Sequence, residues 1–220
     1  MPKKASGQES VRTPVQERSQ KRVAQILSAA RAIIERQGAA GLKMSTIAAE
    51  ADVSIGSIYQ YFPNKSAIIA ALAEQVLGAN TRKNMEVLAK RPASLVQLSH
   101  ITTELLDQYY RLLRNDPVYR DILTGHASDK KLLTADQDDT VANRDHIFAM
   151  SNHLFRAEEH ERAKMALLMI VSFGGAAAAI AADCCEDEGR RAMEDAKAML
   201  FAAWEVSILP LGHKHGASDK

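Results

Sequence analysis

The stretch STIAAEADVSIGSIYQYFPNKSAIIAAL, residues 45 to 72, decides the fold of the amino-terminal part of the chain. Ser45 is a good N-cap for a short helix that runs to Ala51. After a break, Ser54 can cap a second short helix that runs to Phe62. Two short helices joined by a three-residue turn predict a helix-turn-helix.

A longer amphipathic helix precedes this pair. Apolar residues recur at helical spacing between Arg18 and Gly38, and the glycine is expected to end the helix. Ile58 and Phe62 are four residues apart, so both should point inward against this apolar stripe. We therefore expect a three-helix module over residues 18 to 65.

The opposite face of the second short helix carries side chains that suit DNA. Ser57 and Gln60 can bond base edges in the major groove, and Ile55 can contact a thymine methyl group. Ser45 is a further expected contact, and phosphate contacts are expected from Thr46, Tyr59, Tyr61 and Lys65. The alternative is a small helical subdomain whose exposed tyrosines are ordinary surface residues.

Residues 18 to 72, roughly a quarter of the chain, resemble the DNA-binding domain of the tetracycline-repressor (TetR) family. Asp52 departs from the family pattern, which usually has glycine in the turn, but Asp enters the left-handed backbone region more readily than most residues. The resemblance implies a DNA-binding transcriptional regulator, a repressor that a small-molecule effector releases from a palindromic operator. It rests on an ordered string of residues: Ile47-Ala48, Val53-Ser54, Gly56, Ile58-Tyr59, Tyr61-Phe62 and Lys65.

Composition and charge agree with this interpretation. The chain of 220 residues is 46% hydrophobic and dominated by strong helix formers, which predicts an all-α protein. Its net charge is only +1, but residues 1 to 65 carry +5 and residues 66 to 220 carry −4. A basic front on a mildly acidic body suits a protein that approaches DNA with its amino-terminal module.

Beyond Lys65 the pattern predicts long helices over residues 65–90, 94–113, 116–125, 134–157, 158–185 and 188–209, about nine helices in all. The expected organisation is a flexible basic arm (1–17), a helix-turn-helix DNA-binding domain (18–65), a larger helical domain for effector binding and dimerisation (66–210) and a flexible tail (211–220).

A homodimer is expected, because a helix-turn-helix gains affinity when a second copy reads the other half-site. The two carboxy-terminal helices are the expected interface. Residues 166 to 182 are apolar all round, and Gly174 and Gly175 allow close approach of backbones. The last helix offers Met193, Met199, Leu200, Ala203, Trp204 and Ile208. The alternative is that this surface is the core of the monomer.

The family resemblance implies a small-molecule pocket between the reading module and this interface. His100, Tyr109, His146 and Phe148 are candidate effector contacts. A stripe of Met and aromatic residues at helical spacing is also what an ordinary core shows, so that alternative stays open.

No metal, cofactor or enzyme activity is expected. His146, His153 and His160 recur every seven residues, about 10.5 Å along a helix, which is too far for two imidazoles on one ion. We interpret Cys184 and Cys185, which are neighbours in the sequence, as reduced thiols near a helix end. Catalytic signatures such as a phosphate-binding glycine loop are missing.

The location is expected to be the cytoplasm. The amino terminus has no signal-peptide pattern, and the uncharged run of residues 165 to 182 is half Ala, Gly or Ser. A helix buried on all sides in a soluble core is favoured over a membrane span. The alternative functions are a helical protein-interaction adaptor without DNA binding and, with less support, an enzyme.

Overall fold

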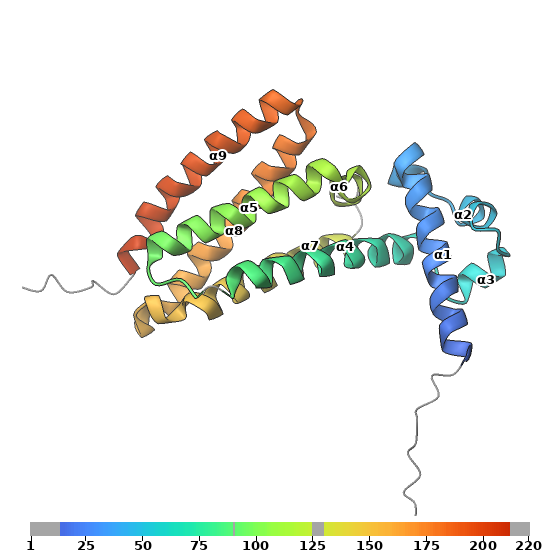
Figure 1. Ribbon diagram of the computed structural model, residues 1–220, viewed down its shortest axis with the longest axis horizontal. Coiled ribbons are helices and arrows are strands. Elements are labelled where there is room, and N and C mark those ends of the chain that lie inside the picture. Colours follow the sequence, from blue (N-terminus) through green and yellow to red (C-terminus); the bar gives the residue numbers. More distant parts are fainter. Residues whose placement is uncertain (1–13, 90, 125–129, 212–220) are drawn as a thin grey trace, which may run out of the picture. The chain divides into compact units, whose positions relative to one another are not determined.

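The structure, a computed structural model, describes residues 14 to 89, 91 to 124 and 130 to 211 (Figure 1). Within these residues it contains nine α-helices, a few short 3-10 turns and no strand, which confirms the all-α fold class. The chain divides into two compact units, Met1–Ile68 and Ile69–Lys220. The division falls in the first turn of a helix, three residues after the expected domain boundary at Lys65.

The smaller unit contains α1 (Pro14–Gln37), the 3-10 turn η1 (Ala39–Gly41), α2 (Met44–Glu50), α3 (Ile55–Tyr59) and the first turn of α4 (Lys65–Leu88). Helix α1 begins four residues earlier than expected, at Pro14, because proline suits the first helical position, where no amide donor is needed. It ends at Gly38, as expected, with a φ of 74°. Residues 1 to 13 of the expected arm lie outside the described residues.

The core of this unit is the predicted apolar stripe of α1. Ile26, Ile33 and Ile34 are 0–2% exposed, and Ile47 of α2, a helix that packs against α1, is fully buried. Two polar contacts fix the angle between the helices. The guanidinium of Arg36 donates to both carboxylate oxygens of Glu50, and Gln25 Nε2 donates to the carbonyl of Ala51 at 2.6 Å.

The turn between α2 and α3 is a Schellman motif. The Val53 amide donates to the Ala48 carbonyl at 3.0 Å, and the Asp52 amide donates to the Ala49 carbonyl at 3.3 Å. Asp52 has a φ of 50° and is the one described non-glycine residue with positive φ. The turn therefore forms with aspartate where glycine fits without strain.

Replacing Asp52 with Gly is expected to raise the free energy of unfolding by about 1 kcal/mol, because the left-handed conformation then costs nothing at Cβ. For a chain of this size the melting temperature should rise by about 2–4 °C, measured by thermal denaturation. Asp52→Ala is the control, because it keeps Cβ and should bring no gain. Equal stabilisation by both variants would contradict the strain argument.

The short helices start and end differently from the sequence prediction. The cap of α2 is Lys43, not Ser45, because the Lys43 carbonyl accepts both the Ile47 amide at 3.1 Å and the Thr46 hydroxyl at 2.8 Å. The Ser54 cap of α3 is confirmed, since its hydroxyl accepts from the Ser57 amide at 3.2 Å. Regular helix ends at Tyr59 rather than at residue 62.

The larger unit contains the rest of α4 and α5 (Leu95–Asn115), α6 (Pro117–Thr124), α7 (Lys130–Ser151), α8 (His160–Asp183) and α9 (Glu186–Ser207), with the 3-10 turns η2 (Asn152–Leu154), η3 (Ala157–Glu159) and η4 (Leu209–Leu211). Helix α8 packs against α5, α7 and α9 (Figure 1). Leu98, Phe155, Leu167, Trp204 and Ile208 form a core among these helices.

Helix α7 ends six residues before the predicted end at residue 157. The Ser151 hydroxyl donates to the Ile147 carbonyl at 2.7 Å, and Phe155 adopts an extended backbone that buries its ring to 2% exposure. Two 3-10 turns therefore separate α7 from α8, where the sequence pattern predicted one helix running directly into the next.

Helix α8 is not buried on all sides, contrary to the expectation. Leu167 and Ala178 are fully buried, whereas Met165, Phe173 and Ile180 are 59–67% exposed. Gly174 is buried within the chain, where an added Cβ would lie 3.3 Å from Leu106 and 3.4 Å from Leu200. That glycine therefore serves contacts with α5 and α9 of the same chain.

The connection between α8 and α9 consists of the free cysteines Cys184 and Cys185, which lie at helix ends as expected. Arg120 donates to the Ala182 carbonyl at 2.8 Å, and Arg114 donates to the carbonyls of Ala182 and Cys184. These arginines satisfy the carbonyls that end α8.

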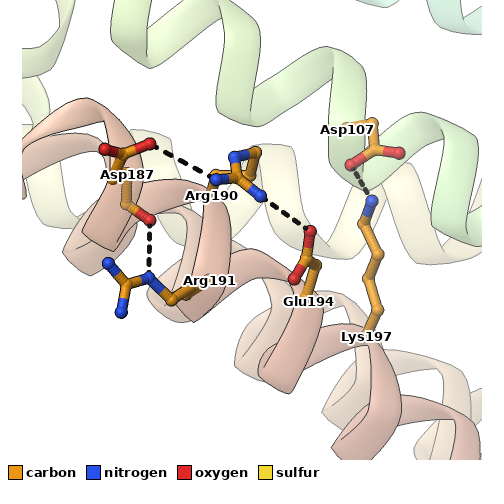
Figure 2. A network of polar contacts seen from close by, with 6 residues as sticks. All are labelled: Asp107, Asp187, Arg190, Arg191, Glu194 and Lys197. Carbon is orange, nitrogen blue, oxygen red and sulfur yellow. Dashed lines mark hydrogen bonds and ion pairs between the residues drawn. The ribbon is translucent and has the colours of Figure 1, made fainter.

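The amino-terminal half of α9 carries a charged surface (Figure 2). Arg190 pairs with Asp187 at 3.3 Å and with Glu194 at 3.5 Å, both on α9. Lys197 Nζ lies 2.5 Å from Asp107 and joins α9 to α5. The exposed apolar residues of α9 lie further along, from Met199 onward.

Candidate nucleic-acid interface and ligand cavity

Helix α3 has one buried and one exposed face. Ile58 is fully buried and Phe62 is 7% exposed, as the spacing predicted. The amides of Tyr61 and Phe62 both donate to the Ile58 carbonyl at 2.9 Å, so a final turn carries Phe62 inward beyond the regular helix. This anchoring fixes the direction in which the remaining side chains of α3 point.

The exposed face holds the residues expected to read bases. Ile55 is 45% exposed, Gln60 is exposed and Ser57 is half-buried. Tyr59 is 52% exposed, and Tyr61 is half-buried. A surface with an amide, a hydroxyl and an apolar group matches the hydrogen-bonding edges and thymine methyl groups of a major groove.

Residues with cationic or hydroxyl side chains precede and follow α3 in the sequence. Ser45 and Thr46 are exposed at the start of α2, and Lys65 is exposed at the start of α4. The Thr46 hydroxyl already donates to Lys43, so its own hydrogen is engaged. Sequence analysis missed Lys43, which is exposed and directly precedes α2. The sequence does indicate this residue, because it lies about one helical turn before Thr46, an expected phosphate contact.

Gly56 lies at the start of α3 on its exposed side. An added Cβ at this position would meet no atom of the chain within 4 Å. Its φ is not positive, so neither internal packing nor backbone conformation calls for glycine there. The missing side chain leaves the backbone of α3 open to close approach from outside.

The larger unit contains a partly open cavity of about 690 Å³. Such a volume lies within the range of small-molecule sites. The wall is mainly apolar and comes from α4 to α9, with Leu105, Leu106, Ile147, Leu168 and Trp204 among its residues.

Polar groups interrupt this apolar wall. Trp204 Nε1 and Asn84 Oδ1 are both buried and have no hydrogen-bond partner among the described residues. Asp139 also lines the cavity and accepts from Asn143 Nδ2 at 2.9 Å. Thr102 and Thr103 line it with hydroxyls that donate to the Ser99 carbonyl at 2.8 and 2.9 Å.

Only Tyr109 of the predicted effector contacts lines this cavity. His100 of α5 is exposed and His146 of α7 is half-buried, and neither is among the residues that line the cavity. Phe148 packs against Phe155 with ring centroids 6.1 Å apart and against the edge of His160. Sequence analysis assigned Trp204 to the dimer interface and did not select Asn84, because no periodicity marks which turn of a helix faces an internal cavity.

The histidines with seven-residue spacing lie in different settings. His153 Nε2 contacts the Pro92 carbonyl at 3.0 Å, and His160 packs on Phe148 at 5.1 Å. Among the described residues no group of three or more potential ligands is placed to hold a metal ion. The pKa of Glu161 lies below its ordinary value because Lys164 donates a hydrogen bond to it. Glu161 does not line the cavity.

Exposed apolar side chains gather on α8 and α9. Met165, Met169 and Phe173 on α8 are 43–59% exposed. Met199, Phe201 and Val206 on α9 are 50–75% exposed. The buried faces of these same segments pack together in one core, so both sets lie at the same end of the helix pair. Met193, Trp204 and Ile208, expected at the interface, are instead buried in the chain's own core.

One helical segment among the described residues, Ala157–Asp183, is long and apolar enough to cross a membrane by length and composition. Its mean hydropathy is 2.1, and 33% of its most apolar window is buried. The core helix of a soluble protein passes the same test, and α8 packs against three other helices of the unit.

Two family models match the chain. The model of bacterial regulatory proteins of the tetR family matches residues 26–72. The model of a tetracyclin repressor-like C-terminal domain matches residues 96–203. The first covers the helix-turn-helix, and the second covers most of the cavity wall, all of α8 and most of α9.

Individual proteins agree with these models. The chain is 29% identical over 120 residues to the HTH-type transcriptional repressor KstR of Rhodococcus jostii (strain RHA1), a match that spans 54% of this chain and about half, 51%, of that protein. A TetR-family transcriptional regulator from Streptomyces coelicolor has a similar fold, with a TM-score of 0.65, 20% identity, and coverage of 85% of this chain and 99% of that one.

The structure of RolR in complex with the ligand resorcinol is also similar, with a TM-score of 0.58 and 18% identity. The similarity covers 90% of this chain and 97% of RolR. At these identities the solved structures establish the shared fold, over nearly the whole length of each relative.

Proposed function

Because the chain belongs to the TetR family of bacterial regulatory proteins, we propose that this DNA-binding regulator is a repressor released from its operator by a small molecule. It binds a palindromic operator as a homodimer, and its effector occupies the cavity of the larger unit. In this proposal the protein regulates transcription and does not catalyse a reaction, and it is located in the cytoplasm.

The observation that carries this proposal is the exposed face of α3. Buried Ile58 and Phe62 hold the helix from behind, which leaves Gln60 and Ile55 free to enter a major groove. In the proposed complex Gln60 pairs bidentately with adenine, Ser57 bonds a base edge and Ile55 contacts a thymine methyl group.

Phosphate contacts position this helix on the duplex. Lys65 and Lys43 supply the cations in the proposed complex, and Tyr59 and Tyr61 supply hydroxyls. The hydroxyl of Thr46 is engaged with Lys43, so this residue contacts phosphate through its backbone amide. Ser45 keeps its predicted role as a neighbouring contact.

The homodimer forms through α8 and α9 of each chain. The exposed apolar side chains on these helices, Phe173 and Val206 among them, would be buried in a four-helix bundle built from two copies. Pairing supplies two copies of α3 for one operator, whose half-sites are expected one helical turn of DNA apart, about 34–36 Å.

The decisive experiment selects bound sequences from a pool of random duplex DNA with the purified full-length protein. A palindromic motif with half-sites one helical turn apart is the expected result. Recovery of no motif, or of a motif without symmetry, would overturn the proposed mode of binding and favour a helical adaptor that contacts protein instead.

Gly56→Ala is expected to separate DNA binding from stability. The new methyl meets no atom of the chain, so stability should stay equal or rise by up to about 1 kcal/mol from the higher helix propensity of alanine. Affinity for the selected operator should fall roughly tenfold or more, because the methyl intrudes where the backbone approaches DNA in both half-sites. Fluorescence anisotropy and thermal denaturation measure the two effects.

Gly41→Ala is the matched control for this substitution. Its Cβ would make an ordinary contact with Gln37 at 3.5 Å, and Gly41 lies in η1, outside the proposed DNA-reading helix. Both variants should therefore fold, and only Gly56→Ala should lose affinity. Unchanged DNA binding by Gly56→Ala would show that α3 does not approach DNA closely at its start.

A further inference from the structure

We infer that the molecule bound in the cavity is uncharged and largely apolar, and that it carries a hydrogen-bond acceptor for Trp204 Nε1. The inference rests on the proposed function only in taking this cavity as the effector site. It names the chemical class of the effector, which follows from the wall of the cavity.

The size and the wall of the cavity set the bulk of the ligand. A volume of about 690 Å³ admits a molecule of drug size. Side chains such as Leu105, Leu106 and Leu168 cover much of the wall. Burial of a ligand against this surface is favourable only where the ligand is itself mainly apolar.

The buried indole supplies the specific polar contact. Trp204 is 2% exposed, and its Nε1 is a donor with no acceptor among the described residues. An indole nitrogen can only donate, so a water or a ligand acceptor has to complete it. A buried donor that makes no hydrogen bond costs free energy. A carbonyl or ether oxygen on the ligand would accept this bond and remove that cost.

Asn84 offers a second point of recognition. Its Oδ1 is buried at the wall and has no donor among the described residues. Because an amide carries both an acceptor and two donors, it can bond a hydroxyl at the opposite end of the ligand or a further acceptor. The contact of a ligand acceptor with Trp204 Nε1 remains the main polar contact of the inference.

The charges of the wall argue against an anion. Asp139 is the only charged side chain among the described residues that line the cavity, and it already accepts from Asn143. A carboxylate or phosphate placed there would be desolvated beside another carboxylate, and the described lining residues include no Lys or Arg to compensate its charge. A bound ammonium group would have Asp139 as its one charged partner among the described lining residues, and it would lose its hydration on entering a mainly apolar wall.

The test uses three probes with one carbon skeleton: 2-undecanone, undecanoate and 1-aminoundecane. Trp204 is the only tryptophan of the chain, so its fluorescence reports directly on the cavity of the full-length protein. Calorimetry gives the affinities. The ketone is expected to bind roughly tenfold or more tightly than either charged probe, because only the ketone enters without an unpaired charge.

Two variants test the site itself. Trp204→Phe should weaken the ketone roughly tenfold, the factor expected for loss of one buried hydrogen bond. Ala179→Leu, which fills the cavity from α8 without removing a core group, should also weaken it roughly tenfold or more. Phe155→Leu is the matched control, because Phe155 is buried in the same core and does not line the cavity.

Three results would overturn the inference: no binding of the ketone, a charged probe that binds as tightly, or unchanged ketone affinity in either cavity variant. The DNA selection described above separates this failure from failure of the proposed function. A palindromic motif without ketone binding would contradict the inference about the ligand and would still support the proposed repressor function. Ketone binding without any DNA motif would contradict the proposed repressor function and would still support the inferred ligand class.

Discussion

The Phe173→Glu protein is expected to be monomeric and to lose operator binding. Phe173 lies on α8, is 59% exposed and does not line the cavity, so the single chain should fold normally. In a symmetric dimer the substitution places a desolvated carboxylate on both sides of the interface. If each buried carboxylate costs about 2 kcal/mol of association free energy, the dissociation constant of the dimer should rise about a thousandfold.

Sedimentation and light scattering measure the loss of the dimer, and anisotropy with labelled operator measures the loss of DNA binding. Val96→Glu is the matched control, because Val96 is 53% exposed at the start of α5 and lies on neither α8 nor α9. That variant should remain dimeric and bind DNA normally. A dimer that survives Phe173→Glu would exclude this face of α8 from the interface.

Local chemistry explains why most helix boundaries could be predicted from the sequence. Gly38 ends α1 in a left-handed conformation, and Ser54 caps α3 through its hydroxyl. Pro117 begins α6, with Asp116 Oδ1 accepting from the Tyr119 amide at 3.0 Å. Each of these signals depends on a few neighbouring residues, so it can be interpreted without knowledge of the tertiary fold.

The predictions that were wrong concern features of the fold that long-range packing determines. The break between α7 and α8 exists because Phe155 turns into a core that also contains Trp204, nearly fifty residues away in the sequence. The exposed face of α8 could not be predicted either. Its residues are apolar on every side, so periodicity does not separate the buried Leu167 from the exposed Phe173.

The cavity shows the same limit for the candidate site. Its wall combines residues from α4 to α9, from Asn84 to Trp204, and only the packing of the larger unit brings them together. His100 and His146 were selected by residue type, and neither lines the cavity. On α3, by contrast, the four-residue spacing of Ile58 and Phe62 was enough to predict which face would be exposed.

Gln60→Ala is expected to weaken binding to the selected operator by about 30-fold to 10⁴-fold. A bidentate Gln–adenine pair contributes about 1–3 kcal/mol, and the dimer loses two such pairs at once. Gln60 is exposed and outside the regular helix, so its truncation should not change the stability or the dimer. Competition between operator and random duplex DNA in anisotropy measures the effect.

The pattern of the loss separates base reading from mere attraction to DNA. Gln60→Ala removes no phosphate contact, so affinity for random DNA and the dependence of binding on salt should stay unchanged. Lys65→Ala should do the reverse, with a uniform loss across sequences and a shallower salt dependence. Gln75→Ala, at an exposed position of α4, controls for loss of an amide elsewhere. Equal losses of specific and random binding in Gln60→Ala would show that this side chain does not read the operator.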